Sequence, residues 1–230
     1  RFRPRSHFGP DRFLRQKPGC QGGCGYSPCH HADRNGHCYC GQLDHLALAD
    51  CWSDYLSELL LGCGSSRVKK LSLEGRAEWS ALTTLDHNAD HAPDVVHDMA
   101  VLPLPFGDDA FEEAHLYECL EHVGTQGDYR FFFDQFADFW RILKPGGVVL
   151  GTVPLPSSPW AWGDPSHTRV IPKESFTFLH QPAYAQVGKT AMSDFRFCYR
   201  ADFDIIHLHE NGDVLEFGLR AVKPSRCQCA

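Results

Sequence analysis

The sequence has 230 residues, a length that suits one α/β domain with a sizeable core. Hydrophobic residues make up 43% of the chain and charged residues 22%, which excludes an intrinsically disordered protein. No run of about 18 apolar residues is present, so no membrane-spanning helix and no membrane partner are expected. The formal net charge is −7, and the chain has 11 cysteines.

The charge is unevenly distributed along the chain. Residues 1–17 contain six basic side chains against Asp11, which gives +5, so the other 213 residues carry −12. An acidic body argues against a broad nucleic-acid-binding surface. The basic segment is either a solvated tail or a contact for an acidic partner chain. It lacks the apolar core of a signal peptide, so we expect an intracellular, cytoplasmic protein.

Residues 1–42 and 43–230 differ in composition. The first region is rich in Gly, Cys, His and Pro and shows no apolar periodicity, so we expect it to be an N-terminal arm. The second region alternates apolar runs with polar or helical stretches, as a single folded domain does. Strands are expected at residues 57–61, 81–85, 94–97, 113–117 and 148–153.

The second half of this domain contains a helix and a hairpin. Residues 129–143 carry several aromatic side chains at helical spacing and are followed by Lys-Pro-Gly-Gly, a helix-ending sequence. Residues 203–209 and 214–222 flank Glu-Asn-Gly-Asp and predict an antiparallel hairpin. Strands that alternate with helices before a hairpin indicate an α/β fold, with a mostly parallel sheet covered by helices on both faces.

Residues suited to a nucleotide-like ligand follow three successive strands. Gly62-Cys63-Gly64 lets the backbone approach a ligand, with a helix N-terminus expected just beyond. Asp86 ends the second strand, where a carboxylate can accept both ribose hydroxyls. Asp98 ends the third strand and can face an adenine amino group. In such sheets ligands bind at the carboxyl ends of the strands, so these residues predict one site.

In this order the motifs resemble those of class I S-adenosylmethionine-dependent methyltransferases, over roughly residues 56–223. The segments that carry the resemblance are Leu-Leu-Leu-Gly-Cys-Gly (59–64), Thr-Leu-Asp-His-Asn (84–88), Asp-Val-Val-His-Asp-Met (94–99), Leu-Pro-Phe (104–106), Glu-Cys-Leu-Glu-His (118–122) and Trp-Arg-Ile-Leu-Lys-Pro-Gly-Gly (140–147). An Asp-Pro-Ser-His-Thr-Arg segment (164–169) is similar to that of small bacterial and phage-type members. The resemblance implies a Rossmann-like fold whose cofactor is S-adenosylmethionine.

The resemblance also implies roles for individual residues. Gly62 and Gly64 would lie under the methionine and ribose, with Cys63 between them. Asp86 would hold the ribose with His87 beside it, while Asp98 and Met99 would frame the adenine. The chain departs from the family at Leu60, where an acidic residue usually contacts the methionine ammonium, and at Ser66, where a third glycine is common.

A second constellation predicts chemistry at the end of the fourth strand. Placed in the first turn of a helix, Glu118, Glu121 and His122 share one face and could bind a divalent ion such as Mg²⁺ or a transition metal. Similar Glu-x-x-Glu-His segments hold the metal in ubiquinone-pathway and small-RNA 2′-O-methyltransferases, and His167 is placed to be the further ligand. The alternatives are that His122 or His167 acts as a general base without a metal, or that the segment only caps the helix.

The cysteine-rich arm is a separate question. Cys20, Cys24, Cys29, Cys38 and Cys40 fall with three histidines inside 21 residues, and tetrahedral zinc needs four such ligands. A segment with so few apolar residues could not order itself by burial, and a metal would stabilise it. Free thiols and disulfides are the alternatives, and a reducing compartment disfavours disulfides.

The sequence therefore predicts an S-adenosylmethionine-dependent methyltransferase. The acceptor is a small molecule, a saccharide or a biopolymer, and O-methylation is preferred because of the Glu-Glu-His set. Trp160 and Trp162 follow the fifth strand and either wall an acceptor pocket or cover the core. A catalytically degenerate methyltransferase-like interaction protein is the alternative, motivated by Leu60, Ser66 and the unusual arm.

Overall fold

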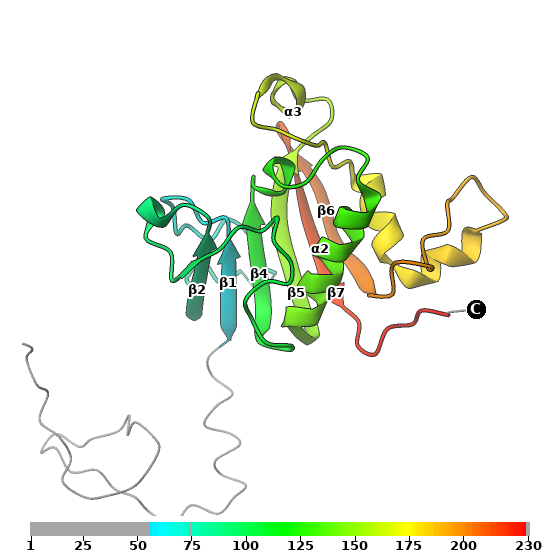
Figure 1. Ribbon diagram of the computed structural model, residues 1–230, viewed down its shortest axis with the longest axis horizontal. Coiled ribbons are helices and arrows are strands. Elements are labelled where there is room, and N and C mark those ends of the chain that lie inside the picture. Colours follow the sequence, from blue (N-terminus) through cyan, green and yellow to red (C-terminus); the bar gives the residue numbers. More distant parts are fainter. Residues whose placement is uncertain (1–55, 74, 229–230) are drawn as a thin grey trace, which may run out of the picture. The chain divides into compact units, whose positions relative to one another are not determined.

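The computed structural model describes residues 56–73 and 75–228. These residues form a seven-stranded sheet in the order β3-β2-β1-β4-β5-β7-β6 (Figure 1). The predicted arm and its five cysteines, Cys20, Cys24, Cys29, Cys38 and Cys40, lie outside the described residues. The zinc site, free thiols and disulfides predicted there stay predictions.

The strands confirm the predicted fold class. The first five, β1 (Ser57–Leu61), β2 (Ala81–Asp86), β3 (Val95–Val96), β4 (Phe111–Tyr117) and β5 (Leu143–Pro154), pair in parallel. The last two, β6 (Phe203–Asn211) and β7 (Val214–Ala221), form the predicted hairpin, and β7 pairs antiparallel with β5. This is a Rossmann-like, mostly parallel sheet, with its switch point between β1 and β4, where the strand order reverses.

One face of the sheet is covered by helix α2 (Tyr129–Ile142), which lies in front of β4, β5 and β7 in Figure 1. The Asp128 side chain begins the helix by accepting a hydrogen bond from the N–H of Phe131. Phe133, Phe136 and Phe139 recur at three-residue intervals and are almost completely buried in the core. Full burial of such a side chain stabilises the fold by about 1.5–3 kcal/mol, so this aromatic face holds α2 on the sheet.

Shorter helices complete this part of the chain. They are the 3₁₀ helices η1 (Ala89–His91), η2 (Leu120–His122), η3 (Lys173–Leu179) and η4 (Gln181–Gln186), and the short α-helix α3 (Pro159–Gly163). Phe176 of η3 is buried between Phe136 of α2 and Phe217 of β7, with ring centroids 6.1 and 4.7 Å away. Within the described residues, every helix is too short or too polar to cross a membrane.

The predicted end of α2 is close to the observed one, but the residues after it differ. Lys144-Pro145-Gly146-Gly147 does not form a separate turn, because β5 starts at Leu143 and includes it. The pairing of β4 with β5 shifts register here, since Phe111 pairs with Leu143 and Glu113 with Val148. Gly146, with φ of 80°, accommodates the irregularity, so the glycines bend a strand as well as ending a helix.

The helix expected after Gly64 is absent from the described residues, so no helix that connects β1 to β2 covers the sheet face opposite α2. Between β1 and β2 the described residues of segment 62–80 form only turns, bends and extended chain. This segment, which we call the strap, packs on the sheet face opposite α2. Lys69 of the strap is buried there against Glu58 of β1 and Glu113 of β4.

The composition of this face explains why the strap, and not a helix, packs on it between β1 and β2. Glu58 and Glu113 are register partners and point to the same side, away from the apolar face that contains Leu59 and Leu61. Buried carboxylates need a cation and hydrogen-bond donors, which the apolar stripe of a packed helix does not supply. The strap supplies both, because Lys69 Nζ lies 3.1 Å from Glu113 and contacts Glu58 as well.

A buried histidine extends this network. His115 Nε2 lies 3.0 Å from Glu113, and its Nδ1 lies 2.8 Å from the hydroxyl of Tyr117, which in turn accepts the N–H of Leu71 of the strap. Trp79 closes the cluster edge-on to His115, with ring centroids 4.8 Å apart. The strap is therefore attached to β4 by polar contacts of Lys69 and Leu71 and by the ring contact of Trp79.

We predict that Lys69→Met lowers the free energy of unfolding by about 3–5 kcal/mol, because it leaves two carboxylates buried without their cation. Lys70→Met is the matched control. Its side chain is 44% exposed and its pairing with Glu118 is at the surface, so its loss costs no more than about 1 kcal/mol. Chemical denaturation of the three proteins measures both values, and equal losses would contradict the role assigned to Lys69.

The same network predicts how stability depends on pH. The hydrogen bond with His115, with help from Lys69, lowers the pKa of Glu113 to about 2, and burial lowers the pKa of His115. In both cases the unfolded chain binds the proton more readily as the pH falls, so acid destabilises the folded state. The loss begins near the ordinary His pKa of 6.5 and continues down to about pH 2.

In Glu113→Gln the part of this loss between about pH 4.5 and pH 2 should shrink. Denaturation curves measured from pH 7 to pH 3 test this expectation. Identical pH slopes for wild type and variant would contradict it.

Candidate functional site

The glycine loop after β1 is held directly by Asp86 at the end of β2. The N–H of Gly64 donates to Asp86 Oδ2 and the N–H of Asn88 donates to Oδ1, each at 2.8 Å. Burial opposes ionisation of this carboxylate, but the two backbone donors outweigh it and lower the Asp86 pKa. The structure thus brings together the glycine loop and Asp86, the first two parts of the predicted cofactor site.

Gly62 is a position where a side chain does not fit. Its φ is +60°, and a Cβ added there would lie 2.8 Å from Cys119 Cβ and 3.4 Å from the methyl carbon of Met99. Gly64 also has a positive φ, of +52°, but an added Cβ would meet no atom within 4 Å. The first glycine is therefore required by packing at the end of β4, and the second by backbone conformation alone.

Two cysteines at this edge are packing residues. Cys63 and Cys119 are buried, and burial raises the pKa of both thiols. Cys119 Sγ lies 3.6 Å from the carbonyl of Leu61. Neither has the lowered pKa of a nucleophilic cysteine, and Cys63, predicted with the cofactor set, offers the site its backbone.

The other predicted cofactor residues lie after β2 and β3. Asp98 is exposed, and its Oδ1 accepts the N–H of Ala100, which leaves Oδ2 open. Met99 is buried against the glycine loop. The His87 side chain is 76% exposed, with its Nδ1 3.5 Å from Asp86. Asp98 Oδ2 thus has no hydrogen-bond partner among residues 56–73 and 75–228, and it lies at the sheet edge that also carries Gly64 and Asp86.

The two departures from the family pattern are visible in the structure. Leu60 is 3% exposed, so this position offers no charged group at the loop. Ser66 is exposed, and its hydroxyl accepts the N–H of Val68. A methionine ammonium at this edge would therefore have to be bound by other groups than the side chain at position 60.

The geometry predicted for Glu118, Glu121 and His122 is wrong in one respect. Glu118 is not in the first turn of a helix; it has a left-handed backbone with φ of 52°, and only Leu120–His122 forms a helical turn, η2. The Glu118 side chain points to the surface, where it pairs with Lys70 at 3.4 Å. Its backbone conformation separates it from the other two residues.

Glu121, His122 and His167 do come together. Their ligand atoms lie within 4.8 Å of one another, and the two imidazole rings stack edge-on with centroids 4.7 Å apart. The loop that carries His167 is fastened to η2, because the N–H of Thr168 donates to the carbonyl of Glu121 at 2.8 Å. His122 Nδ1 lies 3.2 Å from the hydroxyl of Ser166 in the same loop.

The electrostatics of this trio are unusual for a surface turn. Burial raises the pKa of Glu121 to about 7, so the carboxylate is costly to ionise in the absence of a cation. Its Oε2 is buried without a hydrogen-bond partner among the described residues, and so is Nδ1 of His167. Two buried ligand atoms without partners, in a trio whose ligand atoms lie within 4.8 Å of one another, fit a divalent ion held by one carboxylate and two imidazoles.

A cavity of about 410 Å³ opens beside this trio at the ends of β4 and β5. Glu118 lines it together with Glu121, His122 and His167, so all four predicted side chains border one space. Trp160 lines its mouth and is 66% exposed, and the neighbouring Trp162 is 71% exposed. Both indoles are thus largely exposed and do not cover the core, and of the two only Trp160 borders this cavity. That they wall an acceptor pocket stays a prediction.

Two features of the structure were not predicted from the sequence. Glu58, Glu113 and His115 form a second group with metal-ligand spacing, but Lys69 occupies its centre and makes it an ion-pair network. In the sequence, this network was indicated only by the polar residues within the strands β1 and β4. Arg169 is the second: it is 6% exposed and donates through Nε to the carbonyl of Leu120, whereas the sequence marked it only as the last letter of a motif.

Comparisons with known proteins give similarity in structure but not in sequence. No protein-family model and no curated protein matches the chain. Solved structures that are similar include a SAM-dependent methyltransferase from Archaeoglobus fulgidus, with a TM-score of 0.46, 13% identity and coverage of 76% of this chain and 90% of that one. One from Mesorhizobium loti has a TM-score of 0.44, 17% identity and coverage of 72% and 91%.

A third similar structure is a putative methyltransferase in complex with the Haloferax volcanii Trm112 methyltransferase activator. It has a TM-score of 0.44 and 16% identity, with coverage of 73% of this chain and 83% of that one. At these values the comparisons by themselves define no activity or substrate for the chain. A functional interpretation therefore has to rest on the strand order and on the residues at the strand ends.

We predict that Gly62→Ala destabilises the protein more than Gly64→Ala. Both place a side chain at positive φ, which costs about 1 kcal/mol. Only Gly62→Ala also forces an atom against Cys119, which adds about 1–3 kcal/mol. The measurement is the shift in thermal midpoint of each variant, and a larger shift for Gly64→Ala would contradict the packing described here.

Proposed function

We propose that this protein is an S-adenosylmethionine-dependent methyltransferase. The observation that carries the proposal is that the sheet edge at the switch point bears, strand by strand, the Gly62–Gly64 loop, Asp86 and Asp98, with a polar cavity beyond β4. In open α/β sheets ligands bind at this edge. The low-identity structural similarities agree with this proposal but add nothing about the acceptor.

The cofactor would lie across the ends of β1, β2 and β3. The Asp86 carboxylate is fixed by backbone donors and keeps further lone pairs for ribose hydroxyls. The open oxygen of Asp98 is an acceptor for an amino group. Met99 supplies an apolar surface beneath a ring system, because it is buried against the glycine loop.

For the methyl transfer itself, the enzyme mainly has to align the reacting groups, because the sulfonium already activates the methyl group. Methyl transfer from a sulfonium is a displacement in line, so the enzyme has to hold the nucleophile close and exclude water. The cavity lined by Glu121, His122 and His167 lies at the ends of β4 and β5, and β4 is the neighbour of β1, which leads into the glycine loop. An acceptor in this cavity would therefore approach a cofactor bound across the ends of β1, β2 and β3. The exposed indole of Trp160 at its mouth suits stacking on a planar or sugar-like acceptor.

We further propose that the trio favours an oxygen acceptor. A hydroxyl must lose its proton as it attacks, and a divalent ion bound by Glu121, His122 and His167 would lower the pKa of that hydroxyl. The unpartnered Glu121 Oε2 and His167 Nδ1 fit such an ion. Glu118 borders the same cavity and can contact a bound acceptor from its rim.

The alternative function is a methyltransferase-like interaction protein without catalytic activity. Leu60 favours it, because the side chain at this position offers no charge to a methionine ammonium. Cofactor binding distinguishes the two functions directly.

Calorimetric titration with S-adenosylhomocysteine should show one site per chain in the wild type. Asp98→Ala should weaken binding by at least tenfold, because it removes the open acceptor. Asp90→Ala, an exposed acid in the neighbouring turn η1, should leave it unchanged. Failure of the wild type to bind at millimolar ligand would rule out the methyltransferase and favour the interaction protein.

The ion site is tested separately with Mn²⁺, which prefers oxygen and imidazole ligands and so discriminates against the cysteines of the arm. Free Mn²⁺ measured by electron paramagnetic resonance should decrease on addition of the wild-type protein. Glu121→Gln should weaken this binding at least tenfold, whereas His87→Ala, an exposed histidine, should not change it. Equal binding by Glu121→Gln and wild type would refute the site.

A further inference from the structure

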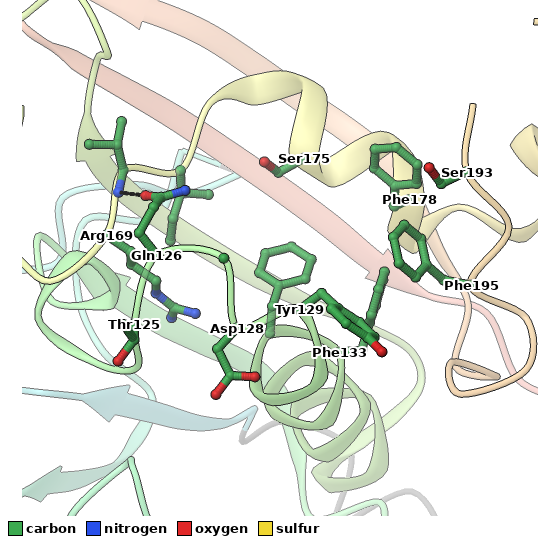
Figure 2. A pocket seen from close by; sticks show the side chains of 14 residues that line it. Thr125, Gln126, Asp128, Tyr129, Phe133, Arg169, Ser175, Phe178, Ser193 and Phe195 are labelled. Atoms are coloured by element: carbon green, nitrogen blue, oxygen red, sulfur yellow. Dashed lines mark hydrogen bonds between the residues drawn. The ribbon is translucent and has the colours of Figure 1, made fainter. Parts of the chain in front are cut away.

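A second cavity, of about 290 Å³, lies at the N-terminal end of α2 (Figure 2). Much of its wall is aromatic, contributed by α2, η3 and the loop before β6. The aromatic residues that line it are Tyr129, Phe132, Phe133, Phe178 and Phe195. This cavity is distinct from the one that carries the Glu121–His122–His167 trio, and the function proposed above does not use it.

Arg169 gives this aromatic cavity a positive charge. The residue is 6% exposed and lines the cavity, and Figure 2 shows its guanidinium near Thr125 and Asp128. Its Nε donates to Leu120 and its Nη2 to Gln135, so these two groups fix the side chain from behind. Nη1 has no hydrogen-bond partner among the described residues, although a guanidinium has five N–H donors.

The guanidinium makes no ion pair among the described residues, since no carboxylate oxygen there lies within 4.0 Å of it and both of its bonded partners are neutral. The carboxylates of Glu121 and Asp128 act on it only from a longer distance. Burial lowers its pKa to about 10, so Arg169 remains protonated at neutral pH. An unpaired buried cation is costly, and an anion that reaches Nη1 recovers that cost.

Asp128 is the one acid among the described residues that line the cavity, and it does not neutralise Arg169. It is exposed, and its Oδ1 accepts the N–H of Phe131 as the cap of α2. Solvent screens an exposed charge much more than a buried one. The N-terminus of α2, a helix of 14 residues, faces the cavity, because Tyr129 and the preceding Gly127 line it. The helix dipole therefore adds a partial positive charge there.

We propose that this cavity binds a small aromatic molecule that carries an anionic group, with the ring among the phenylalanines and the anion on Arg169. Charge-assisted hydrogen bonds from a guanidinium to a carboxylate or phosphate are strong and directional. A neutral ring of the same shape gains the apolar contacts but leaves Arg169 unpaired. Selectivity for the anion over its neutral analogue is therefore the mark of this site.

Arg169 lies between the two cavities. Arg169 borders a narrow gap that Glu121 and His167 also line. If the proposed methyl transfer holds, a molecule in the aromatic cavity lies next to the reacting centre and forms part of the acceptor. The binding itself needs neither cofactor nor metal, so its failure is distinguishable from failure of the proposed function.

The first experiment compares two probes with the full chain in the absence of cofactor. The probes are 1-naphthaleneacetate and the uncharged 1-naphthaleneacetamide, which share one ring system. Saturation-transfer NMR should show that the acid binds at least tenfold more tightly than the amide. Equal affinities, or no binding of the acid at 5 mM, would overturn the proposal.

The second experiment places the binding in this cavity. Ser175 of η3 lines it, and Ser175→Phe fills the space, so the affinity for the acid should fall at least tenfold. Thr177→Phe is the control, because Thr177 is exposed on the same helix and does not line the cavity. If Ser175→Phe does not fold, Ser193→Trp fills the cavity from the exposed loop opposite. Undiminished binding by a folded filling variant would overturn the proposal.

Discussion

The structure depends on one buried cation, Lys69, placed between Glu58 and Glu113 on the sheet face opposite α2. Two carboxylates cannot remain ionised in that position without it. Because the same strap begins with the glycine loop, the ion pair also fixes where Gly62 and Gly64 lie against Cys119 and Asp86. The ion pair on the sheet face opposite α2 thereby helps to position the glycine loop at the carboxyl ends of the strands, where we place the cofactor. A protein that covered this face with an apolar helix would have needed apolar strands at both carboxylate positions.

A second constraint shapes the other half of the edge. The segment that contains Ser166 and His167 is attached to η2 by backbone hydrogen bonds to Glu121, and Arg169 continues that attachment through the carbonyl of Leu120. These contacts bring one carboxylate and two imidazoles together although 45 residues separate Glu121 from His167 along the chain. They also leave Arg169 as a buried cation between two cavities. The Glu121–His122–His167 trio and the aromatic cavity thus both result from the attachment of one loop to η2.

Much of the fold could be predicted from the sequence, since apolar strands, the aromatic stripe of α2 and the hairpin turn are local patterns. Expected and observed bounds differ by only a few residues except in β5, where a bulge lets Pro145 and Gly146 remain within a strand. The helix expected after Gly64 was wrong because its residues were weighed without the surface on which they pack. The polar letters of β1 and β4 become decisive only once the strands are paired and Glu58 lies beside Glu113.

For the site, the sequence by itself determined which residues could act: glycines and acids at successive strand ends, and the Glu-Cys-Leu-Glu-His segment. Strand ends follow from the sequence because strand periodicity is local and parallel strands share one edge. Only the tertiary structure decided that Glu118 turns outward while Glu121 meets His122 and His167, because a single left-handed residue reorients the chain. Only the tertiary structure revealed that the Arg169 guanidinium is buried and makes no ion pair among the described residues, since both are properties of packing among distant segments.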